Sequence, residues 1–288
     1  MAYRLLPKDR WKVATLLSLG CVAIASVVGL ALKRQEGPSR CAPGWVSLGP
    51  RCCAEGQSLH AGSCVGRAKV CPSGFHAVVD GCAIDDKRVR IGVTRLSIGP
   101  NDWQSEQVVP VEESVPEFWV DAAEVTRERW QNCVTSAHCT PLTPGELGQP
   151  ATMVTPEQAG MYCAVNGGRL PRLNERLALA SGAHSRRFPW GQTGLVCRRA
   201  AFGVVDGPCA ERGNQPDVAG CHPDGRSPEG VFDLSGNVAE IALDASGRAW
   251  ACGGSFRSRT ALELKSWACV FLPAPADDVG FRCVYDKI

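Results

Sequence analysis

The stretch GVFDLSGNVAE, residues 230–240, decides the fold class of this sequence. It sets two carboxylates, Asp233 and Glu240, among Gly, Ser and Asn residues, which favour turns over long helices or strands. In the sequence around it, Gly, Pro and Asp recur roughly every ten residues. The whole chain holds 31 Gly and 20 Pro among its 288 residues. We therefore expect a folded domain that is rich in loops.

Six further motifs occur with this stretch, in one order along the chain. They are FWVD (118–121) with EVT (124–126), PATMVT (150–155) with Ala159 and Tyr162-Cys163, GRLP (168–171), FPWG (188–191), GGSF (253–256) and GFRC (280–283). Any one of them is a weak signal, but the seven together resemble the sulfatase-modifying-factor domain family, typified by the formylglycine-generating enzyme. The resemblance implies an α+β fold of the irregular C-type-lectin-like kind for residues 117–288.

The residues of this region agree with such a fold. Residues 156–165 predict an amphipathic helix, with Thr155 as its N-cap, Pro156 in the first position and Glu157 in the first turn. Residues 174–181 (NERLALAS) predict a second short helix.

A connecting segment, residues 83–116, precedes this domain. Within it, residues 89–98 partly alternate polar and apolar side chains, which predicts a strand. Residues 101–116 are acidic and polar, which predicts a loop or an edge strand.

The resemblance also raises the question of copper. The family's enzymes oxidise a substrate cysteine to formylglycine, with copper held by two cysteines just after a Gly-Gly-Ser-Trp motif. Thiolates suit copper(I) because both are soft. Here the two ligand positions fall at about Ser258 and Glu263, and neither side chain can replace a thiolate. The family's Asn-x-Trp-Glu-Trp is NVAEI (237–241), and its Leu-Pro-Thr-Glu is LPRL (170–173). We therefore expect no copper and no family catalysis.

A structural calcium ion is the one cofactor that the resemblance implies. Carried over position by position, its ligands are the carboxylates of Asp233 and Glu240 and the backbone carbonyls of Gly236 and Val238. Such hard oxygen donors suit calcium. The alternative is a turn closed by Asp233, with Glu240 exposed. The five histidines show no His-x3-His or His-Glu-x2-His spacing, so a histidine metal site is not evident.

The 16 cysteines begin with an internal repeat in residues 41–82. Three units have the same C-x10-C spacing, with Gly three residues after the first cysteine: Cys41 to Cys52, Cys53 to Cys64 and Cys71 to Cys82. Each unit is typical of a hairpin clamped by a disulfide, with Gly supplying positive φ. Pairing within each unit is the obvious choice among fifteen connectivities that six cysteines allow. A zinc site is the weaker alternative, because no C-x2-C spacing occurs.

The remaining cysteines predict further disulfides in the second domain. Cys133 and Cys139 close a short loop after the first helix, and Cys252 and Cys269 flank GGSF and can cross-link it. By resemblance, Cys163 pairs with Cys283. The sequence leaves open how Cys197, Cys209 and Cys221 pair.

The N-terminal region predicts a membrane anchor. Residues 13–32 carry no charge and as a helix would span about 30 Å, the thickness of a bilayer core. Basic residues are more frequent before than after them, which places residues 1–12 in the cytoplasm and the bulk in the periplasm or outside the cell. Residues 33–40 then form a linker. The alternatives are a signal peptide cleaved near Ala23-Ile24-Ala25 and a lipid attached to Cys21.

These features favour a binding protein of the cell envelope. The net charge of +2 gives no excess of positive charge for nucleic acid. We expect a single-pass protein of the inner membrane whose domain acts as a binding or assembly module for a protein partner, with residues 41–82 as a spacer, a binding stalk or a plain extension. The predicted binding face comprises Arg186, Arg187, Arg257, Arg259, Glu263 and Trp267.

Two other functions stay open from the sequence. One is an enzyme, either a cysteine oxidase with a non-standard thiol pair or an enzyme of another reaction class, with Cys269 and the unpaired member of Cys197, Cys209 and Cys221 as candidates. The other is carbohydrate binding through calcium.

Overall fold

The computed structural model describes residues 41–48, 51–60, 63–98, 111–195, 198–203 and 215–287. The predicted anchor 13–32 and its flanks 1–12 and 33–40 lie outside these residues, as do Cys197 and Cys209. Among the residues that are described, no helix has both the length and the apolar character needed to cross a membrane. They all belong to one compact unit, Arg40–Ile288.

The cysteine-rich repeat folds as three antiparallel hairpins. They pair β1 (Trp45–Leu48) with β2 (Arg51–Ala54), β3 (Ser58–His60) with β4 (Ser63–Val65), and β5 (Phe75–Val78) with β6 (Gly81–Ile84). The second cysteine of each unit lies opposite the residue five positions before it, in the pairs Ser47–Cys52, Leu59–Cys64 and Ala77–Cys82. The sequence repeat is therefore also a repeat of strand register.

Each hairpin is entered by the same turn. The glycine three residues after the first cysteine has a positive φ in every unit, 87° at Gly44, 94° at Gly56 and 86° at Gly74. The next amide donates to the carbonyl three residues before it, as Trp45 does to Ala42. Positive φ at this position is what a type II turn needs. This confirms the conformation predicted for these glycines.

The three predicted disulfides of the repeat, Cys41–Cys52, Cys53–Cys64 and Cys71–Cys82, are present. Each one joins the residue before the entry turn to the returning strand. Cys52 and Cys53 are neighbours on β2, so this strand takes part in two successive units. Only a short sheet and a small core support each hairpin, so the disulfides supply much of its stability.

The second domain begins with a three-stranded antiparallel sheet of order β15-β10-β7. Its strands are β7 (Arg88–Ile91), β10 (Phe118–Asp121) and β15 (Val284–Tyr285). A separate pair joins β8 (Thr94–Ile98) to β9 (Val111–Val115). The strand predicted at 89–98 is thus two strands separated by Gly92 and Val93, and each pairs with a different partner.

A four-stranded sheet of order β13-β12-β11-β14 carries the C-terminal motifs. Its strands are β11 (Ala239–Leu243), β12 (Ala249–Cys252), β13 (Cys269–Phe271) and β14 (Val279–Gly280). Strands β11 and β14 run parallel, and the other pairs are antiparallel.

Three α-helices and two short 3-10 helices complete the described elements. They are α2 (Arg127–Thr135), α3 (Pro156–Val165), α4 (Leu173–Ser181), η2 (Gly182–His184) and η4 (Pro223–Gly225). Helix α3 has the bounds and the N-cap that the sequence predicts: Thr155 Oγ1 accepts from the amide of Gln158, and Gln158 Oε1 accepts from the amide of Thr155. This reciprocal pair is a capping box.

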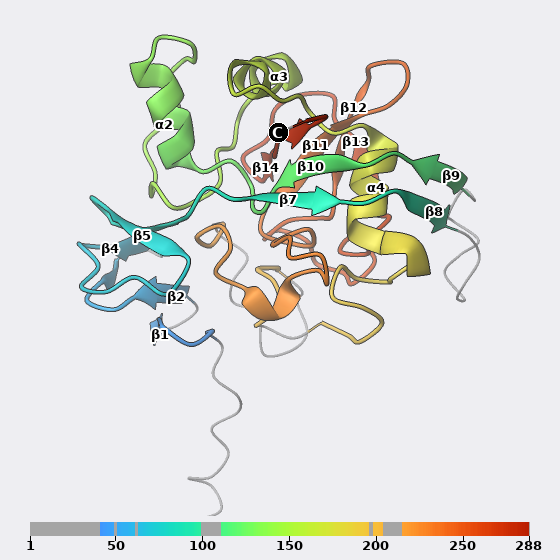
Figure 1. Ribbon diagram of the computed structural model, residues 1–288. Helices are drawn as coiled ribbons and strands as arrows, with labels where there is room; N and C mark the ends of the chain where they lie inside the picture. The colour runs from blue at the N-terminus through green and yellow to red at the C-terminus, as the bar shows by residue number, and fades with distance from the viewer. Residues whose placement is uncertain are drawn as a thin grey trace, which may run out of the picture. The chain divides into compact units, whose positions relative to one another are not determined.

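Two larger apolar cores and a smaller one, around Phe188, Phe202 and Leu264, hold the domain together. Figure 1 shows the helices and strands that carry them. In the first, helices α2 and α3 meet the C-terminal strands through Trp130, Tyr162 and Phe281, whose ring centroids lie 5.4 to 5.9 Å apart. The predicted disulfide Cys163–Cys283 crosses this core, and Cys133–Cys139 closes the loop after α2. The second core packs α4 against β8, β9 and β10.

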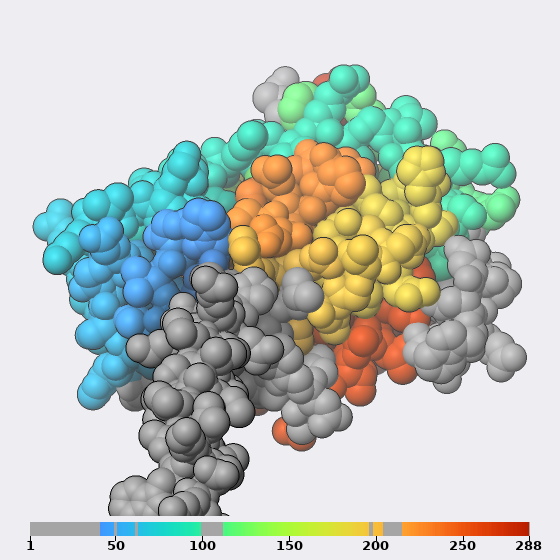
Figure 2. Space-filling view, turned by 90° about the horizontal axis from the view of Figure 1, so that it is seen from below, coloured from blue at the N-terminus to red at the C-terminus, as the bar shows by residue number. Residues whose placement is uncertain are grey.

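The hairpins share a further core with the second domain. Val218 and Cys221 pack among Cys41, Cys52 and Cys82. Figure 2 shows the hairpins, in blue and cyan, against the segment that follows residue 215, in orange. This contact makes the repeat a part of the compact unit.

Candidate functional site

The loop after β12 is the region where the family's chemistry is expected. Its glycines allow a close approach of the backbone: a Cβ at Gly254 would lie 2.5 Å from the carbonyl oxygen of Glu263 and 2.6 Å from Ser258 Oγ. The Ser255 amide donates to Ser258 Oγ at 3.0 Å, and the Ser258 amide donates to the Ser255 carbonyl at 3.0 Å. The loop is therefore a tight, hydrogen-bonded structure.

The two positions for copper ligands do not fit copper. Ser258 is buried, and its hydroxyl already accepts from an amide. Glu263 is exposed, and its Oε1 accepts from the amide of Thr260 at 3.1 Å and from its hydroxyl at 2.7 Å. Copper(I) prefers soft thiolates to such hard oxygen donors.

The predicted cross-link beside this loop is present. Cys252 on β12 and Cys269 on β13 lie directly opposite each other and form a disulfide. Cys269 therefore offers no thiol for the alternative oxidase pair. Of the three cysteines whose pairing the sequence left open, Cys221 is a buried thiol.

The carboxylate of Glu240, one of the predicted calcium ligands, does not fit calcium, and this corrects the expectation from the resemblance. Glu240 is fully buried between two arginines: its Oε2 lies 2.7 Å from Arg176 Nε, and its Oε1 lies 2.9 Å from Arg282 Nε and still closer to Arg282 Nη2. Two guanidinium groups thus neutralise the carboxylate that the cation needs. The alternative of an exposed Glu240 is equally wrong.

The other three predicted ligands lie in the turn before β11. Asp233 is buried and accepts the amide of Gly220 at 2.5 Å, Gly236 donates to the carbonyl of Gly253 at 2.9 Å, and the Val238 side chain is buried. The Gly236 contact joins this turn to Gly253, directly after β12, and the Asp233 contact joins it to the segment before Cys221.

Asp233 forms an acidic pair with Glu124 instead. Burial raises the pKa of Glu124 well above its ordinary value, and the negative charge of Asp233 raises this pKa further. Glu124 Oε1 accepts from Asn237 Nδ2 at 3.1 Å. Two buried carboxyl groups so close cannot both be ionised at modest cost, so we assign a proton to Glu124.

The predicted binding face is only partly exposed. Arg186 is buried, and its two terminal nitrogens donate to Glu229 at 2.8 and 3.0 Å, so it holds the core instead of facing a partner. Arg187 and Trp267 are half-buried. Three members of the predicted face, Arg257, Arg259 and Glu263, are exposed.

Exposed apolar side chains extend this surface along the chain. Val270 and Phe271, on the edge strand β13, are 67% and 54% exposed, and Leu262 is 43% exposed. Arg257 Nη2 lies 2.5 Å from Asp277 Oδ2. We call the exposed residues of this stretch, Arg257, Arg259, Leu262, Glu263, Val270 and Phe271, the exposed segment. Ser258 and residues 264–266, which lie between them, are buried. The sequence did not point to β13 because three residues are too few for a strand pattern.

A groove of about 730 Å³ lies at the other end of β12. It is bounded by α3, α4 and the β11–β12 turn, with Leu170, Leu177 and Leu243 on its walls and Arg172 and Asp244 among its polar groups. Its size suits a small ligand.

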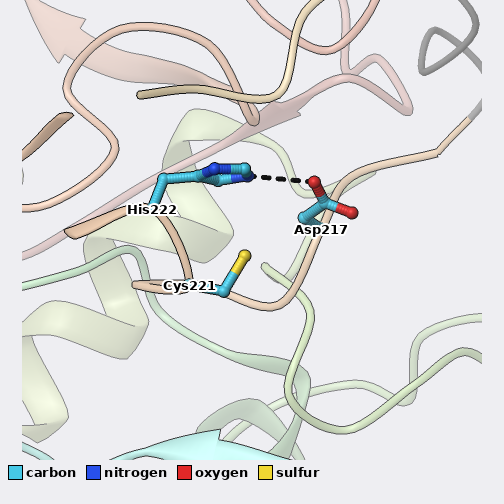
Figure 3. A group of neighbouring side chains, drawn as sticks. All are labelled: Asp217, Cys221 and His222. Atoms are coloured by element: carbon cyan, nitrogen blue, oxygen red, sulfur yellow. Dashed lines mark hydrogen bonds and ion pairs between the residues drawn. The ribbon is translucent and has the colours of Figure 1, made fainter. Parts of the chain in front are cut away.

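Three potential metal ligands come together at the junction with the hairpins (Figure 3). Asp217 Oδ2 lies 2.9 Å from His222 Nε2, and the donor atoms of Asp217, Cys221 and His222 all lie within 4.8 Å of one another. All three residues are buried. The sequence search for paired histidines missed them, although the Asp-x3-Cys-His spacing was a possible signal.

Comparisons with known proteins agree with this architecture. Residues 87–287 match the family described as sulfatase-modifying factor enzyme 1-like domain. The match includes β7, within the predicted connecting segment. No curated protein shows a significant sequence match to the chain.

The solved structures that share the fold include the following two. Treponema denticola variable protein 1 is 17% identical, with a TM-score of 0.56 over 74% of this chain and 98% of that chain. PvdO from Pseudomonas aeruginosa is 16% identical, with a TM-score of 0.58 over 69% of this chain and 94% of that chain.

Proposed function

The chain belongs to the sulfatase-modifying factor enzyme 1-like domain family, and from this membership we propose that it is a binding or assembly module of the cell envelope that lacks the family's copper chemistry. The observation that carries the proposal is the pair of oxygen side chains, Ser258 and Glu263, at the positions of the copper thiolates. Both are engaged in hydrogen bonds within the loop.

The exposed segment is the proposed partner surface. It begins at the loop after β12 and ends on β13, which is an edge strand among the described residues, so it offers arginine side chains, apolar side chains and strand hydrogen-bonding groups to a partner. The disulfide Cys252–Cys269 holds its base rigid. A rigid, partly apolar surface with a charged rim is typical of protein interfaces.

Residues 13–32 anchor the protein in the inner membrane in this proposal, and the residues after them lie in the periplasm or outside the cell. The disulfides support an oxidising compartment, because such bonds are rare in the cytosol. The partner is then another protein of the envelope.

Site-specific photo-crosslinking in native membranes tests the proposal. A photoreactive residue at Phe271 of the full-length protein is expected to give an adduct of discrete mass. The same residue at Val79 is the control, because Val79 lies in the hairpins and is even more exposed, 79% against 54%. Reversing charge with Arg257→Glu and Arg259→Glu is expected to reduce the adduct at least about tenfold. Equal adduct yields at Phe271 and Val79 would contradict the proposed surface. An unchanged yield at Phe271 in the charge-reversal variants would contradict it as well.

An activity assay separates this proposal from the oxidase alternative. The purified full-length protein is supplied with copper, oxygen, a thiol reductant and a cysteine-containing peptide, and the peptide is analysed by mass spectrometry. We expect the peptide to keep its cysteine. Conversion to the aldehyde would show that the domain is catalytic.

A further inference from the structure

We propose that Asp217, Cys221 and His222 bind a divalent cation of the zinc type, and that this cation fastens the cysteine-rich hairpins to the second domain.

The donor set matches zinc chemistry. Thiolate, imidazole and carboxylate are the three ligand types that zinc takes in proteins, at about 2.0 to 2.3 Å. Tetrahedral geometry at those lengths places the donor atoms about 3.3 to 3.6 Å apart. The three donors already lie within 4.8 Å of one another, and they point into a common space in Figure 3. Small side-chain adjustments therefore suffice to enclose a cation.

Burial and charge favour the metal-bound state. The three side chains are buried, where an isolated thiolate is costly. A zinc-type cation removes the thiol proton of Cys221, which leaves to solvent, and binds the resulting thiolate. One dication with a thiolate, a carboxylate and a neutral imidazole is an electrically neutral set. Such a set can be buried at low cost.

Neighbouring residues orient the ligands. Arg51 Nε lies 3.1 Å from Asp217 Oδ1, which leaves Oδ2 on the side of His222. Arg51 Nη2 also lies 3.8 Å from Glu146. The guanidinium therefore keeps a negatively charged neighbour when Asp217 binds a cation. Outer partners of this kind fix the geometry of metal ligands.

A water molecule can complete a four-coordinate site. Asp233 lies close by, because the Gly220 amide donates to its Oδ2 at 2.5 Å. Its carboxyl group is paired with Glu124, and it is not among the donors that lie within 4.8 Å of one another.

The position of the cluster gives the cation its role. Arg51 belongs to β2 of the first hairpin, and Cys221 packs among the hairpin disulfides. A cation bound by residues 217–222, with its ligand Asp217 held by Arg51, thus joins the hairpins to the second domain. We assign it a structural role at this junction.

Cobalt is the probe that tests the site. The full-length protein is stripped with a chelator under non-reducing conditions and titrated with Co²⁺, which reports a cobalt–thiolate bond through charge-transfer absorption. We expect one equivalent to bind, and we expect Zn²⁺ to displace it and abolish the absorption. Zn²⁺ is also expected to raise the melting temperature of the stripped protein.

Two ligand variants and one control complete the test. Cys221→Ser is expected to lose the charge-transfer band, and Cys221→Ser and His222→Gln are each expected to weaken binding at least about 100-fold. His138→Gln, at an exposed histidine outside the cluster, is expected to bind like the wild type. The proposal is overturned if the stripped wild type shows no charge-transfer band, or if both ligand variants bind cobalt as the wild type does. The wild-type readout decides the question even where a variant fails to fold.

Discussion

Arg282 and Glu240 form an ion pair in the centre of the second domain, with Arg282 Nε 2.9 Å from Glu240 Oε1 and both side chains fully buried. Arg176 binds the second oxygen of the same carboxylate at 2.7 Å. The arginines also donate to backbone carbonyls, Arg282 to Asp121 and Phe232 and Arg176 to Leu234. One carboxylate therefore ties together α4, β11 and the C-terminal motif GFRC.

Removing the charge of Glu240 should destabilise the domain severely. Glu240→Gln removes the carboxylate that binds both buried guanidinium groups, and breaking buried pairs of this kind costs about 3 to 5 kcal/mol. Equilibrium urea unfolding of the purified protein measures the change. Glu263→Gln, at an exposed carboxylate, is the control and should stay within about 0.5 kcal/mol. A calcium chelator should leave the wild type unchanged; a chelator effect that disappears in Glu240→Gln would restore the calcium assignment.

The disulfides should differ in value according to the length of chain that they close. Cys163–Cys283 spans 120 residues and Cys133–Cys139 spans 6. Loop-closure entropy then predicts a loss of about 5 kcal/mol for replacing the first pair with alanine and about 2 kcal/mol for the second. The comparison is made by urea unfolding of the two double variants. Equal losses of unfolding free energy would show that packing in the native state, and not the entropy of the unfolded chain, determines how much each disulfide stabilises the protein.

His76 should make the stability of the protein depend on pH. Its Nε2 lies 2.9 Å from Glu128 on α2, and its Nδ1 lies 3.0 Å from Asp85. The hydrogen bond with Glu128, together with the weaker effect of Asp85, outweighs desolvation and raises the pKa of His76 above 6.5. The protonated imidazole thus stabilises the folded state fully below about pH 6.5, and this contribution is lost as pH rises through the higher folded-state pKa.

The size of this effect is at most about 1 kcal/mol, because the side chain is partly exposed. Unfolding midpoints at about pH 5.5 and about pH 8.5 bracket the titration. Subtracting the pH dependence of Glu128→Gln from that of the wild type isolates the pair. If the two proteins respond identically to pH, the contact between the hairpins and α2 carries no charge interaction.

Local signals in the sequence were sufficient for several elements. Helix α3 was predicted to the residue because Thr155 and Pro156 fix its start within one turn. The hairpin disulfides followed from a spacing that repeats three times, and Cys252–Cys269 from its place around one motif. In each case the deciding residues are close together along the chain.

Long-range partners could not be read in the same way. Glu240 was assigned to calcium because its partners Arg176 and Arg282 lie 64 and 42 residues away along the chain. No local sequence pattern predicts such distant ion pairs. Arg186 was predicted to be exposed because its partner Glu229 lies 43 residues later in the chain. No sequence pattern links the two residues. The cluster at Asp217 and His222 is local, but its supporting Arg51 comes from the hairpins, which the sequence treated as a separate module.

The glycines on either side of β12 provide the last prediction. Gly247 and Gly254 both have positive φ, 81° and 65°, so alanine at either position pays the same type of backbone strain, about 1 to 2 kcal/mol. Their surroundings differ: a Cβ at Gly247 meets nothing within 4 Å, whereas one at Gly254 would overlap the Glu263 carbonyl and Ser258 Oγ. Gly254→Ala should therefore destabilise the protein by more than Gly247→Ala, and it should also displace the loop that begins the exposed segment. Thermal unfolding measures the first difference, and the crosslinking yield at Phe271 measures the second. Equal losses of stability would mean that the loop after β12 can move to accommodate a Cβ at position 254. That result would contradict the tight hydrogen-bonded structure described for the loop.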